Sequence, residues 1–444
     1  MFMAAAVVFA YSAAGSFAAE GENTGDVKSG KITVISAGNE QDYTSMEEAI
    51  NSVPKDNSNV TIKLNGNYVG NGIKVTGNQN ITIDLNGNTW DITGLVGSTG
   101  TETNGLQLLK GATVTIKNGT LKSDKARLLI QNYCNLTLDG VTLSKGYVAV
   151  GDIVVSNNNG STTITGGTVI DADDNVIAFD SDKWGNYDGG DVTLINGTIN
   201  GDVQATNGGK MELSGGTING NVIAKNYIYS GFEQQSGTII ISGTAVNGDV
   251  LAESKGLISV SDGNIKGVIS STGDNKVEIT GGEFGTLGNG VNISADVAVE
   301  FTSNGETKTV VGKDNVEKII ANLTDGDEIV FIKEPEGMEL EEIPDGVTVG
   351  NKSNNVISVN GDNLANGEEI TVESEVSETP GGDNQQGGNG TDSDKNNQNA
   401  KTTGTDKNEA TPETGDNPAI LGCIILMLTS VALGGTLIAG RRRG

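Results

Sequence analysis

Apolar and polar residues alternate strictly in short stretches that recur between about residues 60 and 295. Examples are Val-Thr-Ile at 114–116, Val-Thr-Leu at 192–194 and Val-Glu-Ile at 277–279. A period of two places alternate side chains on opposite faces of a strand, so each stretch predicts a strand with one buried face. Helical spacing is nearly absent from this region. The pattern therefore predicts an all-β fold made of many short strands.

A short phrase of glycine, apolar residue and Asn-Gly also recurs, as GTINGDV at 197–203, GGTINGNV at 215–222 and GTAVNGDV at 243–250. Units of about 20 residues with short strands and Gly/Asn turns are typical of a solenoid, whose repeats pack only against their neighbours. Asn-Gly suits a corner with left-handed backbone, and asparagine side chains can hydrogen-bond from one repeat to the next. The repeat predicts a stiff rod built from little apolar material.

These strands and turns resemble the right-handed parallel β-helix of the pectate-lyase-like superfamily. The resemblance implies coils that stack at roughly 4.8 Å, with ladders of Ile, Val and Leu inside. We expect this right-handed parallel β-helix solenoid to cover residues 60–295, with an antiparallel solenoid as the alternative. The Leu-x-x-Leu-x-Leu signature of leucine-rich repeats does not occur.

The open ends of such a solenoid need covers, because exposed strand edges promote aggregation. In TSMEEAINSV, Thr44 and Glu47 have the spacing of a capping box, which predicts a helix within an N-terminal cap over 20–59. Beyond the last glycine phrase, stretches such as DEIVFI and EEITVES alternate with one expected helix at 314–322. We expect a C-terminal cap or small β-rich domain over 296–375.

Both ends of the chain have the composition of targeting segments. Residues 1–19 are apolar and end in small residues, which predicts a secretory signal peptide. Residues 419–439 are uncharged and long enough to cross a membrane as a transmembrane helix, and a basic tail follows them within 412–444. The polar stretch 376–411 has almost nothing to bury and predicts a disordered linker that spans the cell wall.

The sequence TPETGD, the apolar span and the basic tail together resemble the cell-wall sorting signal of Gram-positive surface proteins. The resemblance implies that a sortase joins the carbonyl of Thr414 to peptidoglycan and releases the chain from Gly415 onward. This chain has Thr411 where the family pattern begins with leucine. We expect a secreted protein that is held in the membrane before sorting and in the cell wall afterwards; a plain C-terminal membrane anchor is the alternative.

Composition limits the chemistry of this protein. With 28 basic against 57 acidic residues, the formal charge of −29 disfavours nucleic acid as a partner. The absence of histidine excludes a Ser-His-Asp triad and any His-ligated metal site. The two cysteines, Cys134 and Cys423, lie in a repeat and in the apolar tail, so no disulfide framework is expected. We expect a monomer without a cofactor, apart from a candidate site for Ca²⁺.

That candidate lies in the acidic stretch DADDNVIAFDSDKWGNYDGGD. Closely spaced aspartates can supply the six to eight oxygen ligands of Ca²⁺. Solvated aspartates in turns are the alternative, and the spacing does not match an EF-hand loop. Enzymes that the fold resembles cut acidic polysaccharides, but we assign no catalytic residue here. The Ca²⁺ candidates are Asp171, Asp173, Asp174, Asp180 and Asp182.

The widest spacings between repeats predict three loops, at 144–161, 172–190 and 222–237, which should leave the rod after the same strand. Aromatic rings beside Asp and Asn suit a sugar-binding surface, because rings stack on sugar faces and polar groups fix the orientation. Alternatively, these rings pin each loop to the wall of the rod. The candidate residues for glycan binding are Tyr147, Trp184, Tyr187, Tyr227, Tyr229 and Phe232.

The sequence therefore favours a non-catalytic surface protein attached to the cell wall, either an adhesin or a stalk that binds polysaccharide or host glycan. One alternative is a surface polysaccharide lyase or hydrolase with a Ca²⁺-dependent site. Another is a purely structural surface component. Glycan retention without cleavage separates the first hypothesis from the other two.

Overall fold

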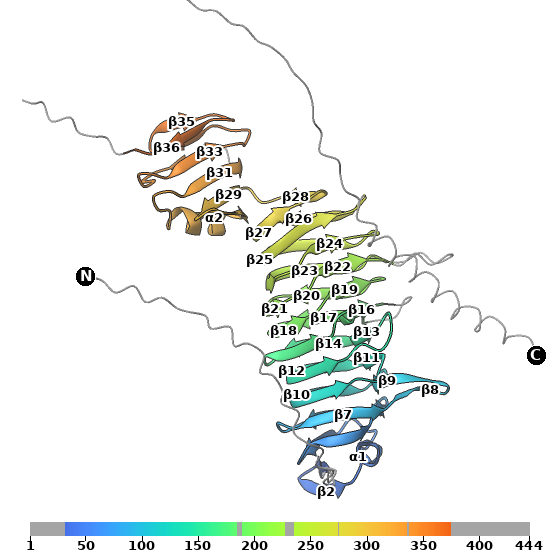
Figure 1. Ribbon diagram of the computed structural model, residues 1–444. Helices are drawn as coiled ribbons and strands as arrows, with labels where there is room; N and C mark the ends of the chain where they lie inside the picture. Colours follow the sequence, from blue (N-terminus) through green and yellow to red (C-terminus); the bar gives the residue numbers. More distant parts are fainter. Residues whose placement is uncertain (1–31, 184–188, 227–234, 274, 335–336, 374–444) are drawn as a thin grey trace, which may run out of the picture.

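The computed structural model describes residues 32–183, 189–226, 235–273, 275–334 and 337–373. Within these ranges the protein is all-β. Most strands run parallel, and the two α-helices are α1 (Met46–Ser52) and α2 (Lys313–Ile320). Figure 1 shows the strands stacked in a long array from α1 and β2 (Asn39–Tyr43) at one end to β28 (Val291–Ile293) near the other. The predictions of an all-β chain and of parallel strands are confirmed.

Strands of the first column pair parallel and in register from one repeat to the next. Their alternating sequences put one row of apolar side chains inside: Ile83, Ile116 and Leu138 are in register and fully buried. Each column thus extends one continuous apolar core. The column contains β3 (Asn59–Leu64), β6 (Asn80–Asp84), β10 (Thr113–Ser123), β12 (Asn135–Lys145), β14 (Ser161–Thr165), β17 (Asp191–Leu194), β20 (Lys210–Leu213), β23 (Thr238–Val246), β25 (Leu257–Ser271), β26 (Lys276–Ile279) and β28.

A second column follows the first within each repeat and is also parallel. The long strands β10, β12, β23 and β25 run through both columns. The other members of the second column are β4 (Tyr68–Asn71), β7 (Thr89–Gly94), β15 (Thr168–Ala172), β18 (Gly197–Asn200), β21 (Thr217–Ile218) and β27 (Gly282–Leu287).

The prediction of three loops is wrong in part, because each of those segments contains a strand of a third column. The strands are β13 (Ile153–Asn158), β16 (Ile177–Asp182) and β22 (Val222–Lys225). These strands are short and carry polar residues outward, so their sequences cannot be distinguished from those of the neighbouring turns. The column is parallel from repeat to repeat and ends on β25. It contains β5 (Ile73–Val75), β9 (Thr101–Leu108), β11 (Leu128–Asn132), β13 (Ile153–Asn158), β16 (Ile177–Asp182), β19 (Val203–Thr206), β22 (Val222–Lys225) and β24 (Val250–Ala252).

The repeated Asn-Gly phrase forms the corner between the second and third columns. A Cβ on Gly220 would lie 2.2 Å from the carbonyl oxygen of Gly201, and one on Gly248 would lie 2.4 Å from that of Gly220. Real Cβ atoms do not come so close to an oxygen, so only glycine allows successive repeats to approach this closely. The glycine recurs for this steric reason.

The asparagine of the same phrase links the repeats along the outside of the corner. Asn247 Nδ2 donates to Asn219 Oδ1 at 2.6 Å, and Asn219 Nδ2 donates to Asn200 Oδ1 at 2.6 Å. Asn200 Nδ2 in turn donates to Asp171 Oδ1 at 3.2 Å. An amide both donates and accepts, so one residue type repeats along the ladder without leaving a group unpaired.

At the N-terminal end, β1 (Ile32–Ser36) pairs antiparallel with both β2 and β3, and α1 follows the hairpin. The N-cap is Ser45, whose Oγ accepts from the backbone N–H of Glu48 at 3.1 Å. The predicted pair Thr44 and Glu47 is therefore wrong by one position. Glu48 instead accepts from the hydroxyl of Thr44 at 2.9 Å, so the box shifts by one residue.

Residues 297–372 pack around a second apolar core. This C-terminal unit joins the array where β30 (Glu306–Val311) pairs antiparallel with β27. Its other strands are β29 (Ala298–Ser303), β31 (Glu328–Lys333), β33 (Thr348–Asn351) and β36 (Glu369–Thr371), with a small sheet of β32 (Glu339–Leu340), β34 (Ile357–Val359) and β35 (Asp362–Leu364). At the other end, β8 (Val96–Ser98) forms an antiparallel hairpin with β9.

No helix within the described part of the chain is long and apolar enough to cross a membrane. The predicted signal peptide at 1–19, the linker at 376–411 and the transmembrane helix at 419–439 lie outside the described residues.

Candidate functional site

The outward side of the third column carries polar side chains on successive strands, all of them buried or only partly exposed, and we call this set of groups the polar face. In the first row of this polar face, strand register places each side chain beside the equivalent side chain of the next repeat. A second row lies two residues further along each strand and therefore points the same way. The polar face comprises Gln107, Gln131, Ser156, Asp180 and Gln204 in the first row, and Tyr133, Asn158, Asp182, Thr206 and Lys225 in the second.

Asp180 and Asp182 lie at the centre of the polar face, both on β16, and are only 6% and 7% exposed. Thr206 Oγ1 on the neighbouring strand donates to Asp180 Oδ1 at 3.3 Å. Burial and the charge of Asp182 raise the pKa of Asp180 to about 7, against the smaller opposing effects of Gln204, Thr206 and Lys225. The two carboxyl groups therefore share a site where one is readily protonated near neutral pH.

The part of the polar face on β9 and β11 is a hydrogen-bonded amide cluster. Asn104 Nδ2 and Gln107 Nε2 both donate to Gln131 Oε1, at 2.8 and 3.0 Å. Gln131 Nε2 donates to the hydroxyl oxygen of Tyr133 at 3.0 Å. Burial, with a contribution from the charge of Asp182, raises the pKa of Tyr133. The phenol thus stays neutral, and its O–H remains a donor for a ligand.

Buried amides beneath the polar face hold the strand ends in place. Asn132 Nδ2 donates to Asn157 Oδ1 at 2.8 Å, and Asn157 Nδ2 donates to the carbonyl oxygen of Gly160 at 3.0 Å. Thr162 Oγ1 also donates to Asn157 Oδ1, at 2.9 Å. Because these groups are buried and paired, the floor of the site is rigid.

Two long connections begin beside the polar face. Residues 183–190 follow the end of β16, and residues 226–237 follow the end of β22. Their described members meet over Gly208, where an added Cβ would lie 3.7 Å from the Cβ of Lys183 and 2.9 Å from that of Gln235. Five of the six aromatic candidates belong to these connections: Trp184, Tyr187, Tyr227, Tyr229 and Phe232 all lie outside the described residues.

The five predicted Ca²⁺ ligands lie in three parts of the structure. Asp180 and Asp182 lie together on the third column, whereas Asp171 belongs to the second column and accepts from the asparagine ladder. Asp173 and Asp174 lie in the turn before β16. Over the described ranges, no group of three or more Asp, Glu or Cys side chains is arranged to hold a metal ion. The Ca²⁺ site stays a prediction.

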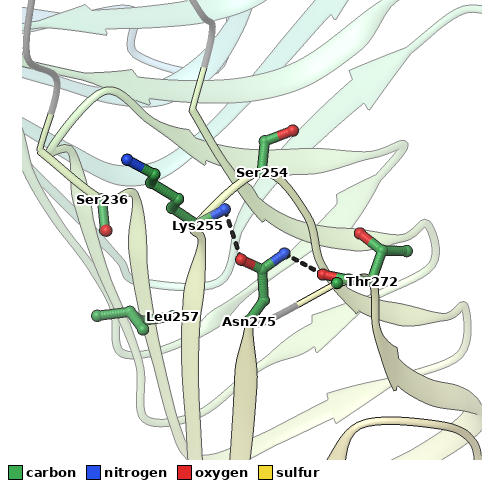
Figure 2. A pocket seen from close by; sticks show the side chains of 7 residues that line it. Ser236, Ser254, Lys255, Leu257, Thr272 and Asn275 are labelled. Carbon is green, nitrogen blue, oxygen red and sulfur yellow. Dashed lines mark hydrogen bonds between the residues drawn. The ribbon is translucent and has the colours of Figure 1, made fainter.

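A cavity of about 520 Å³ lies beyond the end of the polar face, between three successive turns (Figure 2). The backbone N–H of Lys255 donates to Asn275 Oδ1 at 2.5 Å, and Asn275 Nδ2 donates to the carbonyl oxygen of Thr272 at the same distance. The lining side chains supply three hydroxyl groups, one amide, one ammonium group and one apolar side chain. They belong to Ser236, Ser254, Lys255, Leu257, Thr272 and Asn275.

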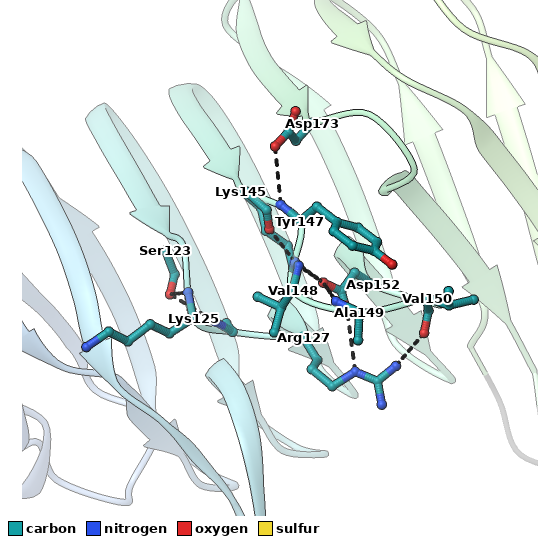
Figure 3. Close-up of polar contacts among 12 residues, drawn as sticks. Ser123, Lys125, Arg127, Lys145, Tyr147, Val148, Ala149, Val150, Asp152 and Asp173 are labelled. Atoms are coloured by element: carbon teal, nitrogen blue, oxygen red, sulfur yellow. Dashed lines mark hydrogen bonds and ion pairs between the residues drawn. The ribbon is translucent and has the colours of Figure 1, made fainter. Parts of the chain in front are cut away.

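In the middle of the third column, a loop that precedes β13 is fixed by a buried ion pair (Figure 3). Asp152 Oδ2 accepts from Lys145 Nζ at 2.8 Å and from the backbone N–H groups of Val148 and Ala149 at 2.7 and 3.0 Å. Arg127 Nε donates to Asp152 Oδ1 at 3.2 Å. Burial would raise the pKa of Asp152, but Lys145 and the two N–H groups outweigh it and hold the pKa below its usual range.

This loop carries the one aromatic candidate within the described residues, Tyr147. Tyr147, Val148 and Val150 are 45%, 43% and 56% exposed. The loop therefore presents three apolar side chains to water on a backbone that Asp152 holds rigid. It precedes its strand, whereas the connections at 183–190 and 226–237 follow theirs. All three predicted segments follow a strand of the second column, and a strand of the third column separates this loop from the position of the other two connections.

Sequence reasoning missed most of the polar face, including Gln131, Tyr133, Gln204 and Lys225. Their signal is a polar residue at the same position of a short strand in several repeats, as Gln131 in LLIQN and Gln204 in VQAT. That signal becomes visible only after the third strand of each repeat has been recognised. The predicted sorting residues Thr414 and Gly415 lie outside the described residues.

Comparison of this chain with known protein families, with characterised proteins and with solved structures gives no match in any of the three.

Proposed function

We propose that this protein is a bacterial surface protein, anchored in the cell wall, that binds glycans without cleaving them. The observation that carries the proposal is the polar face, where ordered amide, hydroxyl and carboxyl groups from successive repeats converge on Asp180 and Asp182. Sugar hydroxyls both donate and accept hydrogen bonds, so a rigid surface with both kinds of group can select one orientation of a ligand.

Two further observations support glycan recognition. The connections that carry the five aromatic candidates both begin at the polar face, and aromatic rings can cover the apolar side of a sugar. The buried amides beneath the face keep its groups in place, which lowers the entropic cost of binding. These two observations support the prediction of an aromatic and acidic binding surface.

We also propose that the three columns form a right-handed parallel β-helix. Each repeat adds one strand to every column in the same order, which is the pattern of one chain coiling around a common core. Crossover connections between parallel strands are right-handed in nearly all known proteins, which favours that hand here. The sorting signal at Thr414 would then attach the rod to peptidoglycan through the polar linker.

Retention of the full chain on a panel of plant, host and bacterial polysaccharides tests the proposed function. We expect retention without release of shorter products, and loss of retention in Gln131→Ala and Asp182→Asn. Glu278→Gln is the matched control, because Glu278 is exposed on β26 in the first column. Equal retention of all three variants would contradict a binding site on the polar face.

One observation favours a second candidate function, hydrolysis of a glycosidic bond. Asp180, with a pKa of about 7, lies two residues from Asp182 on β16, and a carboxyl group that is protonated near neutral pH can serve as a general acid. This candidate predicts shorter products whose release is abolished by Asp180→Asn. Absence of product with every glycan that is retained would eliminate hydrolysis and leave binding.

A further inference from the structure

The cavity in Figure 2 is built around a turn with unusual backbone geometry. Ser254 and Lys255 have φ values of 45° and 70°, in the left-handed region that disfavours residues with a Cβ. Most other described residues that have positive φ and are not glycine are asparagine, which tolerates this region. Two adjacent residues with a strained backbone, such as Ser254 and Lys255, persist only where the surrounding structure or a function requires that conformation.

An equivalent turn elsewhere in the array shows that the strain is avoidable. Residues 207–209 connect β19 to β20 and residues 253–256 connect β24 to β25, and both turns close with a short backbone hydrogen bond. In the first turn the two left-handed positions are Asn207 and Gly208, with φ values of 50° and 87°. Strand register aligns Gly208 with Lys255. This repeat therefore has a lysine where the fold itself favours glycine.

The side chain of Lys255 is placed where it can contact a ligand. None of the ion pairs in the described ranges uses its ammonium group. Hydroxyl groups of Ser236, Ser254 and Thr272 lie around the same cavity, and Leu257 adds an apolar surface that is 45% exposed. The volume of the cavity, about 520 Å³, is within the range of small-molecule sites.

We propose that this cavity binds an oxyanion substituent, carboxylate or sulfate, on a sugar unit of the glycan. The ammonium group of Lys255 pairs with the oxyanion, the three hydroxyl groups bond to the sugar hydroxyls, and Leu257 packs against the ring. The cavity lies at the end of the column that bears the polar face, so one extended glycan can reach both. The inference rests on the proposed function and specifies the class of glycan.

The test measures the affinity of the full chain for three probes: an oligogalacturonate, a sulfated galactan oligosaccharide and a neutral galactan oligosaccharide of the same length. Lys255→Gly removes the ammonium group and also relieves the backbone strain, so it should fold and unfold at a higher temperature than the native chain. We expect it to bind at least one anionic probe about tenfold more weakly, with the affinity for the neutral probe unchanged.

Lys266→Ala is the matched control, because Lys266 is an exposed lysine on β25, the strand that follows the turn of Lys255, and it lies on another side of the array. It should leave all three affinities unchanged, and Lys255→Arg should retain binding of the anionic probe. Equal losses in Lys255→Gly and Lys266→Ala would overturn the inference, since they would indicate general attraction by positive charge. If the native chain binds all three probes equally well, the inference is overturned but the proposed function is not. Failure to bind any probe would overturn it and remove support for the proposed function.

Discussion

At the residue scale, the polar groups of this protein that should matter for function are the buried ones. Asp180 is nearly inaccessible to water, and the neighbouring carboxyl group of Asp182 makes its ionisation costly. Asp152 is also buried, but it has Lys145 and two backbone N–H groups as partners and so remains ionised. Two buried aspartates, one on β16 and one just before the neighbouring strand β13, therefore have opposite pKa shifts, and the difference lies in their partners.

The first prediction concerns the pH dependence of stability. Because the pKa of Asp180 is raised to about 7 in the folded protein, the folded state keeps a proton that the unfolded state loses near the ordinary pKa of 3.8. The stabilising contribution of this proton is present at low pH and is lost as the pH rises towards 7. Asp180→Asn should therefore show a smaller fall in the free energy of unfolding between about pH 4.5 and 7.5, measured by chemical denaturation. An unchanged fall would contradict the buried, protonated state of Asp180.

The second prediction concerns the thiol of Cys134, whose pKa burial raises to about 12. A thiol must ionise to attack most reagents, so Cys134 should not react with an aromatic disulfide at about pH 8 in the folded protein. In a Cys423→Ser variant it is the only thiol of the chain, which makes the count unambiguous. We expect less than one tenth of the thiol to react before a denaturant is added and nearly all afterwards. Rapid reaction in the native state would contradict the burial of Cys134.

At the element scale, the corner of each repeat determines how closely neighbouring strands can approach. The glycine of the Asn-Gly phrase is required by contact with the preceding repeat, and the asparagine adds a ladder of side-chain hydrogen bonds. Small residues at the corner and branched residues in the strands therefore have distinct physical roles. The recurrence of the phrase follows from both.

The third prediction tests the steric role of this glycine. In Gly220→Ala the new methyl group would overlap the backbone of Gly201, so the strands must move apart. We expect a loss of about 3 kcal/mol or more in the free energy of unfolding, measured by chemical denaturation. Thr217→Ala, on the half-exposed position of adjacent β21, should cost less than about 1 kcal/mol. Similar losses for the two variants would argue against close contact at the corner.

At the scale of the whole molecule, one continuous core joins the stacked strands, and further elements pack at both ends of the array. The hairpin of β1 and β2 with α1 covers one end, and the C-terminal unit joins the other through β30. The chain then continues from the C-terminal unit into the predicted linker and sorting signal. This order suits a protein that presents its ligand site outside a cell wall.

The fourth prediction tests attachment to the wall. In a Gram-positive host with a sortase, the native chain should be released only when peptidoglycan is digested. Thr414→Ala removes the residue whose carbonyl the sorting resemblance places at the new bond, so this variant should be extracted with membranes by detergent instead. Extraction of the native chain by detergent alone would indicate a plain membrane anchor. Immunoblotting of the wall and membrane fractions distinguishes these outcomes.

The sequence by itself determined the class of fold, because a period of two and a recurring glycine corner are local properties. The alternation around Val114 and Ile116 is enough to predict a strand with one buried face, and the register in the structure agrees. The position of the α1 cap was predicted to within one residue, since Thr44 and Ser45 both suit an N-cap. These features depend on neighbours along the chain.

Only the tertiary structure decided which polar residues share a site. Asp171 and Asp180 belong to one acidic stretch of sequence, yet they lie on different columns. Gln131 and Thr206 are far apart in the chain, yet both belong to the polar face that surrounds Asp180. The reason is that stacking brings together residues from successive repeats, whereas alternation along a strand only determines which side of it they face.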